Sequence, residues 1–135
     1  MRENKLSIII DKPIAVVFEF TTNPYNTPKW ISSIQEEIIE EFPTRIGTKY
    51  KNRSNSDAEW NIYQVVEYKL DDVFTLSDMV GNYHVRYTYI MVDESHTELE
   101  YHEWMKTGEL ENPFKQEVLE NLKQVMERIR AFYRA

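Results

Sequence analysis

This chain contains no cysteine, and glycine occurs only three times in its 135 residues. Without cysteine there is no disulfide, no thiolate nucleophile and no thiolate metal ligand. Three glycines are too few for the glycine-rich loops that cradle phosphates, and the sequence has no P-loop, dinucleotide-binding glycine pattern or nucleophile elbow. These absences argue against thiol-dependent enzymes and against nucleotide-binding folds.

Long apolar runs and excess positive charge are also lacking. No stretch approaches the roughly 18 apolar residues of a membrane span, and residues 1–5 lead into a short strand-like segment without the apolar core of a signal peptide. The 16 basic and 23 acidic residues give a net charge of −7, which disfavours nucleic acids and anionic membranes as partners. We therefore expect a cytoplasmic protein with no nucleic-acid partner, no integral membrane contact and no cofactor.

What the chain does contain is enough apolar material for one core. Hydrophobic residues make up 41% and aromatic residues 13% of the sequence. A chain of this size folds as one domain, and this composition is not that of a disordered segment. No internal repeat, linker or low-complexity tract divides it, so residues 1–135 are expected to form a single domain.

The stretch 113–134 is predicted to be one long amphipathic helix. Asn112 and Pro113 suit its cap and its first turn, and acidic residues come early and basic residues late, which complements the helix dipole. At 1.5 Å per residue the helix would be roughly 33 Å long and would need a broad apolar surface to lie on. Its apolar face consists of Phe114, Val118, Leu122, Val125, Ile129 and Phe132, widened by Leu119, Met126 and Tyr133.

The rest of the chain reads mainly as strands. A β-branched run at 6–10 is followed by two short helices, whose starts are marked by Asp11–Pro13 and by Thr27-Pro28. Six alternating segments follow, at 34–42, 48–53, 58–68, 73–79, 83–92 and 97–105. The prediction is an α+β helix-grip fold, in which a curved, seven-stranded antiparallel sheet wraps on the long C-terminal helix, with the two short helices between strands 1 and 2.

Short motifs along the whole chain match, in the same order, those of one known family. They are the opening stretch 9–18, Trp30, Ile46-Gly47-Thr48, Val65-Val66-Glu67-Tyr68, His96-Thr97 with Leu99, and Leu122-Lys123 with Glu127. With them the sequence resembles the START-like superfamily, also called SRPBCC, whose members include polyketide cyclase/dehydratase-like proteins. The chain departs from the family pattern at 69–71, where many members carry proline, and in the short link 106–112, which leaves little material for a lid.

The resemblance implies that an apolar or amphipathic small molecule binds between the helix and the sheet. Members of the family include lipid carriers, hormone-binding proteins, aromatase/cyclases and co-chaperone domains, and the fold alone does not choose among them. We expect binding of a hydrophobic or aromatic small molecule in a cavity between the C-terminal helix and the sheet. The alternatives are a polyketide cyclase/dehydratase-type enzyme that uses an inward carboxylate, and a co-chaperone-like interaction domain.

Two carboxylates are candidates for catalysis. Glu103 shares the inward-facing odd positions of 97–105, and Asp78 faces inward if Gly81-Asn82 is a two-residue turn that pairs Asp78 with Val85. A carboxyl group in an apolar cavity has a raised pKa, which suits a general acid or base. Glu103 could instead be a solvated or ion-paired residue at a cavity mouth, and one extra turn residue would point Asp78 outward.

The candidate ligand-binding residues come from the inward positions of the strands and from the helix. The inward parity of 58–68 stays open, since Trp60 and Ile62 favour even positions and the family resemblance favours Val65. The three histidines fall on outer positions or a turn, so no metal site is expected. The ligand-binding candidates are Trp60, Phe74, Leu76, Tyr87, Tyr89, Tyr101, Met105, Val118, Leu122 and Met126.

The acidic run 36–41 is predicted to be a solvated strand face. It alternates weakly, with Ile38 grouped among the inward positions and Glu37 among the outward ones. In this interpretation Ile39 is exposed or lies at an interface.

Overall fold

The computed structural model describes residues 1–129. The order of its elements is the one that the sequence predicts. They are β1 (Glu3–Ile10), α1 (Ile14–Thr22), the 3₁₀ helix η1 (Pro24–Lys29), β2 (Glu36–Ile39), β3 (Lys49–Arg53), β4 (Asn61–Lys69), β5 (Val73–Asp78), β6 (Tyr83–Asp93), β7 (His96–Met105) and α2 (Gln116–Arg128).

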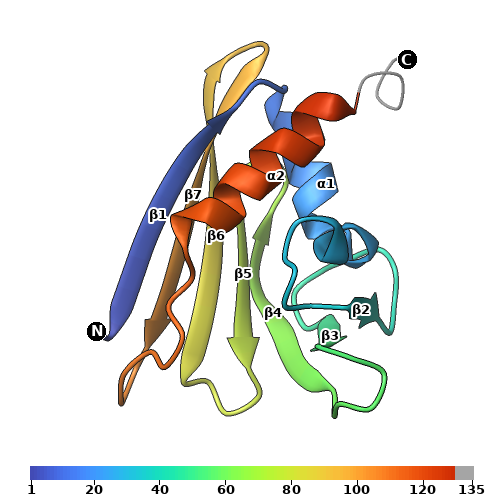
Figure 1. Ribbon diagram of the computed structural model, residues 1–135, viewed down its shortest axis with the longest axis vertical. Coiled ribbons are helices and arrows are strands. Elements are labelled where there is room, and N and C mark those ends of the chain that lie inside the picture. Colours follow the sequence, from blue (N-terminus) through green and yellow to red (C-terminus); the bar gives the residue numbers. More distant parts are fainter. Residues whose placement is uncertain (130–135) are drawn as a thin grey trace.

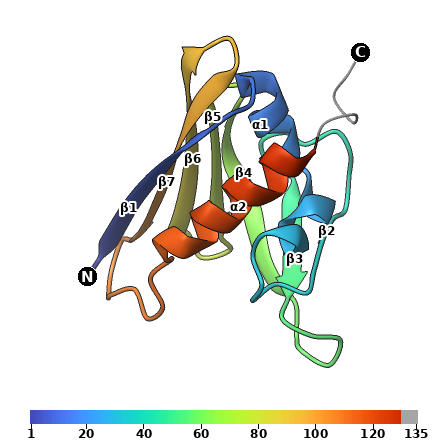
Figure 2. The ribbon, with the colours of Figure 1, turned by 45° about the horizontal axis from the view of Figure 1, so that its top comes forward.

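The seven strands form one antiparallel sheet in the order β1-β7-β6-β5-β4-β3-β2. Helix α2 lies diagonally across one face of this sheet, while α1 and η1 lie near the end that carries β2 and β3 (Figures 1 and 2). The predicted α+β helix-grip architecture is confirmed. Five hairpin connections join β2 to β7 in sequence, and β1, which is separated from β2 by α1 and η1, pairs antiparallel with β7 at the other end of the chain.

Helix α2 begins later than the sequence predicts. Its N-cap is Lys115, in extended conformation and without a side-chain cap bond, so Asn112 and Pro113 do not start it. The reason lies in Phe114, whose N–H donates to Glu103 Oε2 at 2.6 Å and whose carbonyl accepts from Asn4 Nδ2 at 2.9 Å. These bonds hold the link before the helix in place. At the other end α2 stops at Arg128, and positions 130–134 of the predicted helix lie outside the described residues.

The face that α2 buries is rotated from the predicted apolar face toward the side on which Leu119 and Met126 widen it. Leu119, Leu122 and Met126 are fully buried, whereas Val118 and Val125 are half-buried at the margin of the contact. The polar side of α2 is tied to the edge strand β1. Gln116 Nε2 donates to the Ser7 carbonyl and Lys123 Nζ to the Ile9 carbonyl, both at 2.9 Å. These contacts satisfy carbonyls that an unpaired sheet edge would leave to solvent.

The second short helix starts earlier than predicted, at Pro24 and not at Thr27. Asn23 ends α1 and also caps η1, because its side chain accepts a hydrogen bond from Tyr25 N at 3.0 Å. Proline at the first position of η1 fits this start. Trp30 follows directly and is buried.

A β-bulge in β4 settles the parity of that strand. Val65 is buried and Val66 is 41% exposed, so the odd positions face inward in this part of the strand. The register against β5 then shifts between Val65 and Glu67, which brings Tyr68 back to the inner face beside Phe74. Trp60 precedes β4 and packs under the Arg53 guanidinium at 4.2 Å, so it does not reach the inner face as predicted.

Candidate functional site

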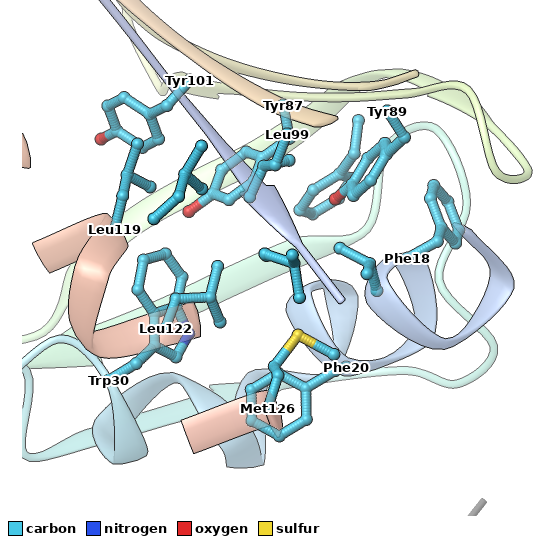
Figure 3. Close-up of a cluster of buried hydrophobic side chains, with 14 of the residues drawn as sticks. Phe18, Phe20, Trp30, Tyr87, Tyr89, Leu99, Tyr101, Leu119, Leu122 and Met126 are labelled. Atoms are coloured by element: carbon cyan, nitrogen blue, oxygen red, sulfur yellow. The ribbon is translucent and has the colours of Figure 1, made fainter. Parts of the chain in front are cut away.

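Most of the space between α2 and the sheet is filled by side chains. Figure 3 shows Leu119, Leu122 and Met126 of the helix facing Trp30, Tyr87, Leu99 and Tyr101. Two of the predicted ligand contacts on the helix, Leu122 and Met126, are therefore core residues. In the described residues these side chains are packed against the sheet, and the largest group of converging polar residues lies beside α2 and not directly beneath it.

Two further ligand candidates also belong to the core. Tyr89 packs edge-on against Phe18 at 4.9 Å between ring centroids, and its hydroxyl is hydrogen-bonded to Thr21 at 2.7 Å. Phe74 is buried between Tyr50 and Tyr87, with centroid distances of 5.5 and 5.9 Å. Both contribute to packing and neither lines a cavity toward α2.

A cavity of about 190 Å³ lies beside this core, toward β2 and β3. We call it the inner cavity. Phe114, in the link before α2, closes one side, and η1 and the loop after it supply Thr27, Ile31, Ser33 and Ile34. The remaining lining residues are Thr21, Glu37, Asn52, Tyr63, Leu76, Tyr83, Val85, Tyr87 and Tyr101.

Glu37 is the buried carboxyl group of the inner cavity, although the sequence analysis places it on a solvated face. It is only 7% exposed. Thr27 Oγ1 donates to Oε1 at 2.6 Å and Asn52 Nδ2 donates to Oε2 at 3.0 Å. Burial raises the pKa of Glu37, and the two hydrogen bonds offset part of that rise. Its partners are neutral donors, so its ionised form carries an uncompensated charge in the described structure.

Four tyrosines face the same space. Burial raises the pKa of Tyr63, and it raises those of Tyr87 and Tyr101 well above the ordinary phenol value. Burial is also the main cause of the raised pKa of Tyr83, followed by its hydrogen bond to Glu103. These phenols therefore stay protonated near neutral pH and can donate hydrogen bonds.

Glu103 lies inside, as its parity predicts, and its carboxylate is fully engaged. It accepts from Tyr83 Oη at 2.7 Å, Asn4 Nδ2 at 2.9 Å and Phe114 N at 2.6 Å. No lysine or arginine in the described residues forms an ion pair with Glu103, and Arg86 on the neighbouring strand pairs with Glu67 at 3.1 Å. Glu103, on β7, thus connects β1, β6 and the link before α2 through hydrogen bonds, which gives it a structural role in the fold.

Asp78 faces the predicted side, but in a different register. Leu76, not Asp78, pairs with Val85, because the turn after β5 spans residues 79–82 and is longer than the two residues predicted. The shift is by two positions, so the facing is unchanged. Asp78 Oδ1 accepts from Asn82 N at 2.8 Å, a bond that closes this turn.

Asp78 and Glu103 line a second hollow of about 540 Å³, which we call the vestibule. It shares Tyr63 and Tyr83 with the inner cavity, and their ring centroids are 6.5 Å apart. The two spaces therefore adjoin at this pair of rings. Met105, one of the predicted ligand contacts, lines the vestibule together with Glu109 and Glu111.

A third hollow of about 510 Å³ lies between α1, the loop 40–48 and the turn after β4. Phe42 and Leu70 at its rim are 86% and 74% exposed. Ile39 lines this groove and is half-buried, so it is not the exposed side chain of the first alternative, while its place at an interface stays a prediction. Tyr50, buried beside it, donates to the Thr22 carbonyl at 2.6 Å.

Among these spaces we take the inner cavity as the candidate site. It is the one in which a buried carboxyl and several buried phenols converge beside apolar side chains. Of the predicted ligand contacts, Leu76, Tyr87 and Tyr101 line it. Sequence reasoning missed Glu37 and Asn52, which the structure pairs across β2 and β3.

The histidines lie away from this site. His84 and His102 stack on Trp104, with centroid distances of 4.9 and 4.7 Å, and His96 contacts Asp93 at 2.8 Å. Within residues 1–129 no group of three or more histidine or acidic side chains is placed to hold a metal ion. The same described part of the chain has no helix with the length and apolar character needed to cross a membrane.

Comparison with known proteins gives matches in structure and none in sequence. No protein-family model matches the chain, and no curated protein matches it. Among solved structures, the protein XoxI from Bacillus cereus superposes with a TM-score of 0.70 at 16% identity, over 94% of this chain and 96% of that one. At this level of identity the likeness concerns the fold.

Two further solved structures carry descriptive names. A START superfamily protein from Mycobacterium smegmatis matches with a TM-score of 0.67 at 10% identity, over 95% of this chain and 96% of that one. The ZhuI aromatase/cyclase from Streptomyces sp. R1128 matches with a TM-score of 0.60 at 15% identity, over 94% and 85%. Together with the strand order and the position of α2, these matches show that the chain has the START-like, polyketide cyclase-like helix-grip fold.

Proposed function

We propose that this protein binds a small hydrophobic or aromatic molecule in the inner cavity, and that it does so in the cytoplasm. The observation that carries the proposal is the convergence of Glu37 and the phenols of Tyr87 and Tyr101 on a space that apolar side chains also line. The apolar side chains are Ile31, Ile34, Leu76, Val85 and Phe114. Ligand sites typically combine an apolar lining with a few fixed polar groups that orient the ligand. The START-like fold supports the same class of function.

The size of the cavity limits the ligand to about one ring. Its volume of about 190 Å³ lies below the roughly 300–1,000 Å³ of most ligand sites. A cavity of about 150 Å³ holds benzene. A single-ring compound with one polar substituent fits, whereas a molecule of several fused rings exceeds the space.

A cyclase/dehydratase-type enzyme is the second candidate function. The observation that favours it is the raised pKa of Glu37, which burial produces inside a cavity lined by phenols. A raised pKa makes a carboxylate a stronger general base than an ordinary glutamate. In this alternative the acid–base residue is Glu37, since the hydrogen bonds of Glu103 are already committed to the fold.

The binding proposal can be tested with p-cresol, a neutral one-ring phenol, by NMR chemical-shift mapping of the full chain. Ser33 is exposed and lines the inner cavity, so Ser33→Trp is designed to plug the space without disturbing the core. Ser32→Trp is the matched control, because Ser32 is equally exposed but does not line that cavity.

We expect p-cresol to shift the amides around Glu37 and Tyr87 in the wild type and in Ser32→Trp, and not in Ser33→Trp. Equal binding by all three proteins would place the site elsewhere. Absence of binding by p-cresol and by a panel of other one-ring compounds would refute the proposal.

A further inference from the structure

The charges around the inner cavity and the vestibule have one sign. Among the described residues that line these two spaces, the titratable side chains are tyrosines and carboxylates. No lysine, arginine or histidine lines either space. Glu109 is paired with the Met1 amino group at 3.2 Å, on the outer side of the vestibule. A ligand that enters through the vestibule therefore crosses a region of negative electrostatic potential. The carboxylates are Glu37 in the inner cavity and Asp78, Glu103, Glu109 and Glu111 in the vestibule.

Aromatic rings form much of the wall of the inner cavity. Tyr101 stacks on Phe114 with a centroid distance of 4.1 Å, and Tyr87 meets Tyr101 edge-on at 5.3 Å. Tyr63 and Tyr83 stand at the junction with the vestibule. The faces of such rings attract cations, and walls of this kind are used to hold organic ammonium groups.

Two buried polar groups remain available to a ligand. Glu37 accepts hydrogen bonds from Thr27 and Asn52, and a carboxylate offers about four acceptor positions. Tyr87 lines the same cavity, and its phenol can donate or accept a hydrogen bond. The carboxylate lacks a counter-ion in the described structure, so a ligand with a cationic N–H group would supply one.

From these observations we infer that the inner cavity is selective for a one-ring compound that carries a positive charge, such as an arylalkylamine, with its ammonium group beside Glu37. The inference rests on the proposed function, since it names the ligand class of the same site. The ammonium group would donate to Glu37 and supply its missing counter-ion. The ring of the ligand would lie among Ile31, Leu76 and Val85.

The test compares benzylamine, which is protonated at neutral pH, with benzyl alcohol, its neutral counterpart of nearly the same shape. Affinities are measured by NMR titration of the full chain at low ionic strength. We expect benzylamine to bind at least about tenfold more tightly than benzyl alcohol. In Glu37→Gln this ratio should fall toward one, because the amide keeps the size and shape of the side chain without the charge.

Glu94→Gln is the control for net charge. Glu94 is exposed in the turn between β6 and β7, so the variant changes the charge of the chain by the same amount away from the site. It should keep the ratio of the wild type. If the ratio persists in Glu37→Gln, the selectivity comes from another part of the lining and the role assigned to Glu37 is wrong.

The two proposals fail in different ways. Equal binding of benzylamine and benzyl alcohol by the wild type would overturn the selectivity and leave the binding function standing. Failure of both compounds to bind, together with p-cresol, would overturn the binding function itself. Because the wild-type comparison decides between these outcomes, the inference stays testable even if Glu37→Gln does not fold.

Discussion

Glu103→Gln tests whether the buried carboxylate of β7 holds the fold together. Both oxygens of Glu103 accept hydrogen bonds, Oε1 from Tyr83 and Oε2 from Asn4 and from the Phe114 amide. Glutamine preserves the shape and can keep its carbonyl oxygen at the Oε2 position. Its amide nitrogen then faces the Tyr83 hydroxyl, which has to become an acceptor.

The expected cost is about 2 kcal/mol of unfolding free energy at neutral pH. Hydrogen bonds to a charged group contribute about 1.5–3 kcal/mol each, and those between neutral groups about 1 kcal/mol. The substitution converts three bonds of the first kind into weaker ones and leaves one amide hydrogen without a partner. Relaxation of the Tyr83 hydroxyl recovers part of the loss, so the net effect lies near the lower end of the sum.

Urea denaturation measures this cost, and amide hydrogen exchange at Phe114 locates it. Tyr83→Phe is the matched variant, because it removes one of the three donors and leaves the carboxylate charged. It should cost about 1–2 kcal/mol, and the double variant should cost less than the sum of the two single changes, since the two groups share a bond. A change below about 0.5 kcal/mol in Glu103→Gln, with unaltered exchange at Phe114, would mean that Glu103 does not anchor the link.

Three other substitutions have definite expected outcomes. Leu122→Ala should cost about 2–5 kcal/mol in urea denaturation, because Leu122 is fully buried against the sheet, and a cost near zero would contradict its place in the core. Tyr50→Phe should cost about 1 kcal/mol, because it removes the bond to the Thr22 carbonyl, and an unchanged melting temperature would show that this bond adds nothing. Glu37→Gln should be more stable than the wild type at neutral pH, because burial raises the pKa of Glu37 in the folded state. The wild type then loses stability as the pH rises from the ordinary value of 4.5 through the raised one, whereas the variant should show no loss from this group.

The long elements could be predicted because their periodicity extends over many residues. Strands β6 and β7 have alternating patterns of ten or so residues, and the inward positions of Tyr87, Tyr101 and Glu103 follow from them. Helix α2 was predictable for the same reason, as an amphipathic stretch before the end of the chain. Its start was not, because the hydrogen bond that the Phe114 amide donates to Glu103 on β7 decides the conformation of Phe114.

The short elements could not be predicted in the same way. Strand β2 has four residues, so its alternation is too brief to choose a face by itself. Tertiary contacts make the choice instead, since Thr27 and Asn52 supply the two donors that allow Glu37 to be buried. A buried carboxylate in an acidic run has no signature in the sequence, because the partners that make its burial tolerable are distant along the chain.

The position of the cavity follows from which part of the sheet each helix covers. Helix α2 is fixed to the edge strand β1 through Gln116 and Lys123, and its buried face fills the space over the neighbouring strands. The other end of the same face of the sheet, toward β2 and β3, is covered by η1 and by the link that Glu103 anchors at Phe114. A six-residue 3₁₀ helix buries only Pro24 and Thr27 of its own residues, too little to fill that space. The volume left for a ligand is therefore set by η1 and the anchored link, and a change in either should alter ligand size more than a change along α2.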